Sequence, residues 1–120
     1  MITAFTEILR QTVEQVPGAI GAIFADWEGE AVDSFAPGAH DDILVLGAHY
    51  GVILHHVQSA LGLSHFGHAE EIIVQHQKVD FILRTVDKHY YVVLVVRAGS
   101  HLATALRVTH AAASALRAEM

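Results

Sequence analysis

The stretch from Gly18 to Phe35 constrains the fold more than any other part of this chain. It reads GAIGAIFADWEGEAVDSF, two short apolar runs on either side of an acidic turn that contains Gly29. Such a pattern is typical of a β-hairpin, because glycine adopts the positive φ of a tight turn at little cost. We therefore expect an antiparallel sheet that begins with this hairpin.

Helices are predicted on both sides of the hairpin. From Thr3 to Val16, apolar residues recur at helical spacing, Thr3 is a suitable N-cap, and Pro17 follows as a helix breaker. After the hairpin, a loop from Ala36 to His40 leads to a long second helix from about Asp42 to Leu61. A carboxylate at the start of that helix would be stabilised by the positive end of the helix dipole.

The second helix carries more apolar surface than one small sheet can cover. One face is formed by Ile43, Leu46, Tyr50, Ile53, Val57 and Leu61. Leu44, Val45, Ala48, Val52 and Leu54 lie outside that face. A helix that is apolar on more than one side is buried on more than one side. Because the sheet can cover only one face, we predict that a second copy of the chain covers the other. Gly47 and Gly51 would permit close approach of another helix, or would only clear space against the protein's own sheet.

Three further strands and a closing helix complete the chain. The strands are predicted at Glu70 to His76, Val79 to Val86 and His89 to Val96, and His65 to His68 are expected to form a loop before them. The closing helix runs from His101 to about Arg117, with Ser100 as its N-cap. The 120 residues are enough for a single domain.

Composition excludes several classes of function. The formal net charge of -6 argues against nucleic acid as a partner, and no basic run points to a membrane surface. The chain has no cysteine, and no apolar run reaches the roughly 20 residues that span a bilayer. With no signal peptide recognised, we expect a cytoplasmic protein that binds neither nucleic acid nor membranes.

Motifs for catalysis or nucleotide binding are missing from the sequence. There is neither GxxxxGK[ST] nor GxSxG, and Ser100 beside His101 fits a helix cap better than a nucleophile. Glu70 and Glu71 are neighbours in a predicted strand, so they point to opposite faces and cannot share a substrate. We expect a protein that is not an enzyme and carries no cofactor.

Ten histidines and one tryptophan are the remaining polar and aromatic features that could bind something. Five of the histidines, His49, His55, His56, His65 and His68, fall on or after the second helix. The H-x-x-H spacing of the last two could bend around a metal, but surface histidines that make the protein pH-sensitive fit better. Trp27 in the hairpin turn is either a partner contact or a lid over the core.

The order α-β-β-α-β-β-β-α in a chain of this size resembles the roadblock/dynein light-chain family, and within it the bacterial MglB-like members. The stretches GAIGAIFADWEGEAV and RAGSHLATALRVTHAAASAL carry the resemblance, which covers nearly the whole chain. It implies an α+β fold in which a five-stranded antiparallel sheet has the second helix on one face and the terminal helices on the other, a profilin- or longin-like sandwich. It also implies a homodimer in which the third strands pair and the second helices lie side by side, and a role in regulating Ras-like small GTPases.

These inferences lead to a non-enzymatic homodimeric regulator or scaffold that binds a Ras-like small GTPase, with stimulation of GTP hydrolysis as one form of regulation. The candidate dimer interface or partner surface comprises Leu44, Ala48, Gly51, His55, Ile73 and Val74, with Leu44, Ala48 and His55 expected to face solvent. Two alternatives are a small-ligand sensor domain and a structural adaptor in a larger complex.

Overall fold

The predicted order of elements is confirmed in the computed structural model, which describes residues 2–38 and 41–120. The elements are α1 Ala4–Gln15, β1 Ala19–Asp26, β2 Ala31–Phe35, α2 Asp41–Ala60, a 3-10 turn η1 Leu63–Phe66, β3 Glu71–Gln75, β4 Val79–Thr85, β5 Tyr90–Arg97 and α3 Leu102–Ala118. The 3-10 turn replaces part of the predicted loop at residues 65–68. The predicted loop before α2 includes residues 39 and 40, which lie outside the described residues.

The five strands form one antiparallel sheet in the order β2-β1-β5-β4-β3. Strand β5 lies at the centre, and its residues Tyr91 to Val96 are buried on both faces, as an uninterrupted apolar run predicts. Strands β2 and β3 form the two edges. The acidic turn between β1 and β2 contains Gly29 at a φ of 87°, which confirms the hairpin.

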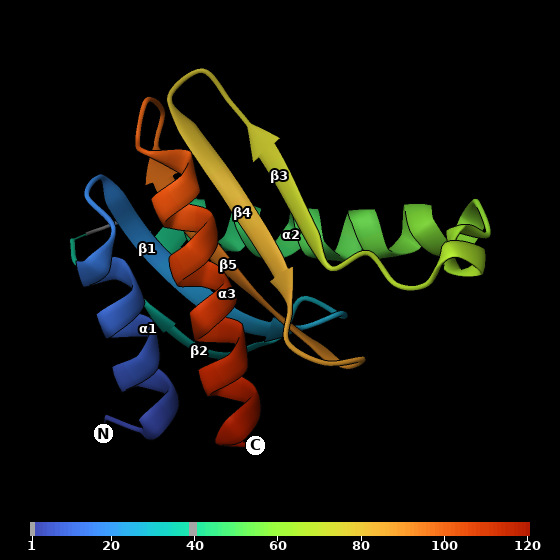
Figure 1. Ribbon diagram of the computed structural model, residues 1–120, viewed down its shortest axis with the longest axis horizontal. Coiled ribbons are helices and arrows are strands. Elements are labelled where there is room, and N and C mark those ends of the chain that lie inside the picture. The colour runs from blue at the N-terminus through green and yellow to red at the C-terminus, as the bar shows by residue number, and fades with distance from the viewer. Residues whose placement is uncertain (1, 39–40) are drawn as a thin grey trace.

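Alternate side chains of the sheet contribute to two separate cores. Helices α1 and α3 cover one face, where Phe24, Leu94 and Ile82 pack against Leu9 and Leu116. Helix α2 covers the opposite face (Figure 1). This arrangement is the layered α+β fold that the family resemblance implied. None of the described helices is long and apolar enough to cross a membrane.

The helix caps follow the predictions at α1 and differ at α3. Thr3 caps α1 with a reciprocal capping box, in which Thr3 Oγ1 accepts from the Thr6 backbone N–H at 3.1 Å. At α3 the predicted cap, Ser100, is wrong. His101 is the N-cap, and its Nδ1 accepts from the Thr104 N–H at 3.2 Å. Ser100 instead donates to the Arg97 carbonyl at 2.6 Å, because it belongs to the tight turn that leaves β5.

Candidate functional site

Helix α2 presses its small residues against the chain's own sheet. A Cβ on Gly51 would lie 2.4 Å from the Tyr91 ring, and one on Gly47 would lie 3.0 Å from Val93. Leu44 and Ala48 are only 3% and 4% exposed in the same core. The expectation that Leu44 and Ala48 face solvent is therefore wrong. The glycines clear space against the sheet, which was one of the two interpretations left open.

The opposite side of α2 is apolar and open to solvent. Val45, Leu46, Ile53 and Val57 are each between 42% and 55% exposed. Exposed apolar residues continue past the helix end at Leu61 and Phe66. The helical period identified the surplus apolar surface correctly, but it does not say which apolar face lies inward. The signal that could have decided this is the run of small residues, because only a face without large side chains lets a helix approach a sheet closely.

Strand β3 gives this side of the molecule an unpaired edge. Thr85 N–H donates to Glu70 O at 3.0 Å and His76 N–H donates to Val79 O at 2.8 Å. Hydrogen-bonded positions alternate along an antiparallel ladder. Val74 lies an even number of residues from both Glu70 and His76, so its backbone N–H and C=O also point toward β4. Ile73 therefore directs its N–H and C=O outward. Among the described residues, no strand pairs with this edge.

Helix α2 and the end of β3 are tied together by side chains. Tyr50 Oη and His76 Nε2 lie 2.5 Å apart, and both rings pack on Phe81. In Figure 1, α2 continues well past β3 on the far side of the sheet. We use the term α2–β3 surface for Val45, Leu46, Ile53 and Val57 of α2 together with Ile73 of β3.

His55 and Trp27 lie on the sheet side of α2 rather than on the α2–β3 surface. The Trp27 ring is stacked between His55, at a centroid distance of 5.0 Å, and Tyr91, at 4.4 Å. Tyr91 Oη donates to the Ala48 carbonyl at 2.7 Å, and burial raises the pKa of the Tyr91 phenol well above its usual range. Trp27 is thus a half-buried lid over the α2 core, and His55 covers its outer face.

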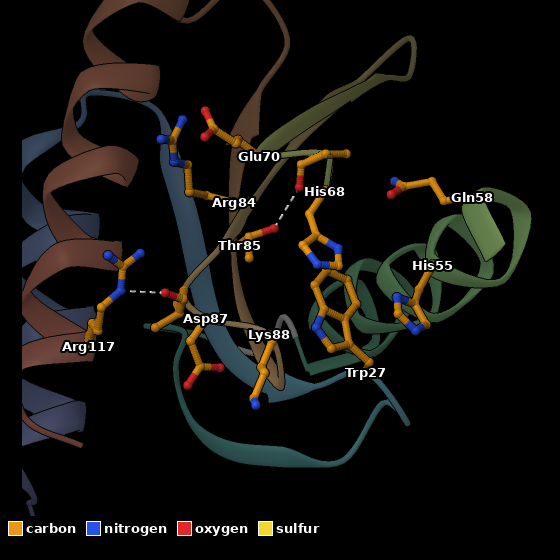
Figure 2. Close-up of a pocket in the computed structure, with 12 residues that line it drawn as sticks. Trp27, His55, Gln58, His68, Glu70, Arg84, Thr85, Asp87, Lys88 and Arg117 are labelled. Atoms are coloured by element: carbon orange, nitrogen blue, oxygen red, sulfur yellow. Dashed lines mark hydrogen bonds between the residues drawn. The ribbon is translucent and has the colours of Figure 1, made fainter. Parts of the chain in front are cut away.

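A cavity of about 360 Å³ opens beside this stack, between Trp27 and the turn that joins β4 to β5 (Figure 2). Its polar lining includes Arg84, Lys88 and Arg117, together with Glu70 and Asp87. His55 and His68 also line it. Within the described part of the chain, no group of three or more His, Asp or Glu side chains is placed to hold a metal ion.

Comparison with known proteins gives matches at the level of structure. No protein-family model matches the sequence, and no curated protein does. MglC from Myxococcus xanthus superposes with a TM-score of 0.72 at 25% identity, over 98% of this chain and 100% of that one. A Roadblock/LC7 domain from Streptomyces avermitilis gives 0.77 at 12% identity, over 94% of each chain. The chain has the roadblock/LC7 fold.

A third structure of the same kind supports this assignment. The gliding protein MglB from Thermus thermophilus superposes with a TM-score of 0.77 at 20% identity, over 96% of this chain and 87% of that one. The superpositions cover nearly all of this chain and most of each compared structure, so the roadblock/LC7 fold accounts for all three described helices and all five described strands. The outward side of α2 and the free edge of β3 are left uncovered by the chain's own core, as is the free edge of β2.

Proposed function

We propose that residues 1–120 act as one domain that forms a two-fold homodimer through the α2–β3 surface. The observation that carries the proposal is the row of half-exposed aliphatic side chains along α2, next to an unpaired strand edge. Contiguous apolar surface of this kind on a soluble chain marks an interaction site. Two copies related by a two-fold axis would cover the row and extend both sheets at once.

The candidate residues take different roles in this proposal. Ile73 offers its outward backbone groups to the second copy, while its 39% exposed side chain lies on the α1/α3 face of the sheet, opposite Ile82 of β4. Val74 supports the strand from beneath, since its side chain packs on the α2 core. Leu44, Ala48 and Gly51 hold the other side of α2 to the sheet and so determine which residues face the partner. His55 contributes through its stack on Trp27.

The proposed role of the dimer is to regulate or scaffold a Ras-like small GTPase in the cytoplasm. Support comes from the resemblance of the sequence to the roadblock/dynein light-chain family and from the likeness to MglB and MglC. The sequence has no phosphate-binding loop, so we expect the protein to act on the partner's own hydrolysis of GTP.

Light scattering on matched variants tests the dimer. Val57→Asp places a charge in the α2–β3 surface, whereas Val32→Asp places the same charge on β2, at the opposite edge of the sheet. The two valines are 43% and 45% exposed, so the substitutions are comparable. We expect a dimer mass for the wild type and for Val32→Asp at micromolar concentration, and a monomer mass for Val57→Asp. A wild-type monomer, or an unchanged dimer in Val57→Asp, would contradict the proposal.

Affinity capture tests the partner. The protein, immobilised at neutral pH, is exposed to an extract of its source organism with GDP or with a non-hydrolysable GTP analogue. The Ras-like GTPase retained is then purified and titrated against the protein. We expect tighter binding with the analogue, and no GTP hydrolysis by the protein alone. Capture of a larger assembly without a GTPase would support the structural-adaptor alternative instead.

A further inference from the structure

The cavity beside Trp27 has a lining that is partly apolar and partly polar. The apolar residues in it are Trp27, Ala69 and Val86, and the Val86 side chain is itself buried in the core under α1 and α3. A volume of about 360 Å³ is within the range of small-molecule sites. Trp27, His68 and Thr85 all border this space, and they are labelled in Figure 2. Such a space accommodates a ring or a short hydrocarbon chain.

Three cationic side chains line the cavity, and the part of the lining near Lys88 and Arg117 is called its mouth. Arg84, Lys88 and Arg117 all line it, although the whole sequence has only seven lysines and arginines and a net charge of -6. Arg84 is already paired, because its Nη1 lies 3.4 Å from Glu71 Oε1. Arg117 is held in place because its Nε donates to the Val86 carbonyl at 2.6 Å. The charged ends of Arg84 and Lys88 point away from the Trp27 wall in Figure 2.

Two carboxylates, Asp87 and Glu70, also belong to the lining and offset part of this charge. Asp87 Oδ1 accepts from the backbone N–H groups of His89 and Tyr90, at 2.8 and 2.9 Å, and thereby closes the β4–β5 turn. Glu70 is exposed, and in Figure 2 its carboxylate lies on the Arg84 side, away from Lys88 and Trp27. Lys88 and Arg117 carry two positive charges against the one negative charge of Asp87, so the lining near them is the part best suited to an anion.

We propose that this cavity binds a small amphipathic organic anion, with its apolar body against Trp27 and Ala69 and its carboxylate or phosphate at the mouth near Lys88 and Arg117. The proposal is independent of dimer formation and of any GTPase partner. It gives the roadblock/LC7 fold of this chain a ligand site at the end of the sheet where the β1–β2 and β4–β5 turns meet.

The only tryptophan of the chain provides the measurement, because it lines the cavity. Trp27 emission is followed while the wild type is titrated with four probes: phenylbutyrate, phenyl phosphate, phenylbutanol and inorganic phosphate. We expect saturable changes with the first two, at dissociation constants of about 1 mM or tighter, which ligands of this size can reach. Phenylbutanol lacks the charge and inorganic phosphate lacks the apolar body, so both should bind at least tenfold more weakly. The stronger of the two anionic probes identifies the preferred head group.

Two matched charge reversals test the cationic side chain, and Ala69→Leu separates this cavity from a neighbouring one that Trp27 and Lys88 also line. Lys88→Glu changes the cavity mouth, and Lys78→Glu makes the same change in the turn at the other end of β4; both lysines are exposed. We expect the dissociation constant to rise at least fivefold in Lys88→Glu and less than twofold in Lys78→Glu. Ala69→Leu fills the interior without altering charge and should weaken both anionic probes at least fivefold. Circular dichroism confirms that each variant is folded.

Three results would overturn the proposal. The first is the absence of a saturable change in Trp27 emission with either anionic probe. The second is equal affinity for phenylbutanol and phenylbutyrate, which would mean that the cationic mouth has no role. The third is an equal effect of Lys88→Glu and Lys78→Glu, which would mean that the anion responds to the overall charge of the protein rather than to this cavity.

Discussion

Gly51 lies where α2 passes over the ring of Tyr91, and no larger residue fits there without movement. A Cβ at this position would lie 2.4 Å from two atoms of the ring. The ring is held from two sides, since its hydroxyl donates to the Ala48 carbonyl and its face stacks on Trp27. Because Gly51 has no side chain, α2 can contact the sheet at this point and Trp27 can stack on the Tyr91 ring.

Replacing Gly51 with alanine should therefore destabilise the protein, although alanine favours helices by about 1 kcal/mol over glycine. Overpacking of a tight core typically costs about 1–3 kcal/mol, and the displaced Tyr91 ring would also strain its bond to Ala48. We expect a net loss of about 1–2 kcal/mol in urea unfolding, accompanied by a change in Trp27 fluorescence. Ser59→Ala, at an exposed position of the same helix, is the control and should stay within about 0.5 kcal/mol. A stabilised Gly51→Ala variant would show that the ring has room to retreat.

At the scale of elements, Asp33 joins the start of α1 to the edge strand β2. Its Oδ2 accepts from Thr6 Oγ1 at 2.5 Å and from Thr3 Oγ1 at 2.9 Å. Partial burial raises the pKa of the Asp33 carboxyl, but the hydrogen bonds from Thr6, Thr3 and the Ser34 N–H outweigh it and lower the pKa below its usual value. The same threonines form the capping box of α1, so the carboxylate supports the cap.

The sign of this pKa shift determines a pH dependence. A lowered pKa in the folded state means that Asp33 contributes stability above about pH 4 and loses it as the pH falls through the folded-state pKa. Asp33→Asn should therefore be less stable than the wild type at pH 7, and the difference should shrink below pH 4. Urea unfolding at pH 7, 5 and 3.5 measures this, with Glu119→Gln as the control. A difference that stays constant with pH would mean that the ionised form is not what the threonines stabilise.

The alternation of hydrogen bonds along β3 gives a second prediction at this scale. Ile73 points its N–H away from β4, so proline at this position removes no bond within the chain. Val74 points its N–H toward β4, so proline there breaks the sheet. We expect Ile73→Pro to keep its circular dichroism spectrum and lose the dimer in light scattering, whereas Val74→Pro should lose the fold as well. If Ile73→Pro remains a dimer, the second copy does not pair along this edge.

At the scale of the whole molecule, two of the ten histidines lie where the proposed dimer would form. His49 and His56 are exposed, and their helical positions fall among Val45, Leu46 and Ile53 on the outward side of α2. Protonation of all ten histidines would change the formal net charge of each chain from -6 to +4. Protonation of His49 and His56 would place positive charges on both chains where their apolar surfaces meet.

Dimer affinity should therefore fall between roughly pH 7 and pH 5.5, the interval in which histidine usually gains its proton. Sedimentation at several concentrations gives the dissociation constant at each pH. The double variant His49→Gln, His56→Gln should lose most of the dependence, whereas His110→Gln, an exposed histidine on α3, should keep it. A dissociation constant that does not change over this interval would place the histidines away from the contact.

The sequence by itself determined the order and type of the elements. The hairpin around Gly29, the α1 cap at Thr3 and the doubly buried strand Tyr90–Arg97 all follow from patterns within a few residues of one another, and local patterns decide local conformation. The order of these elements was also enough to suggest the roadblock/LC7 fold. The cap predicted at Ser100 failed because a turn hydrogen bond to Arg97 competed for the same side chain.

Only the tertiary structure decided which face of α2 lies inward. The periodicity of the helix gave two apolar faces, and the choice depends on Tyr91 and Val93, which lie far along the chain and leave no room for a side chain at Gly51 and little at Gly47. The same holds for the cavity, whose walls come from the β1–β2 turn, α2, the β4–β5 turn and α3. Side chains so far apart in sequence meet only when the sheet closes, so no local pattern could have placed Lys88 and Arg117 beside Trp27.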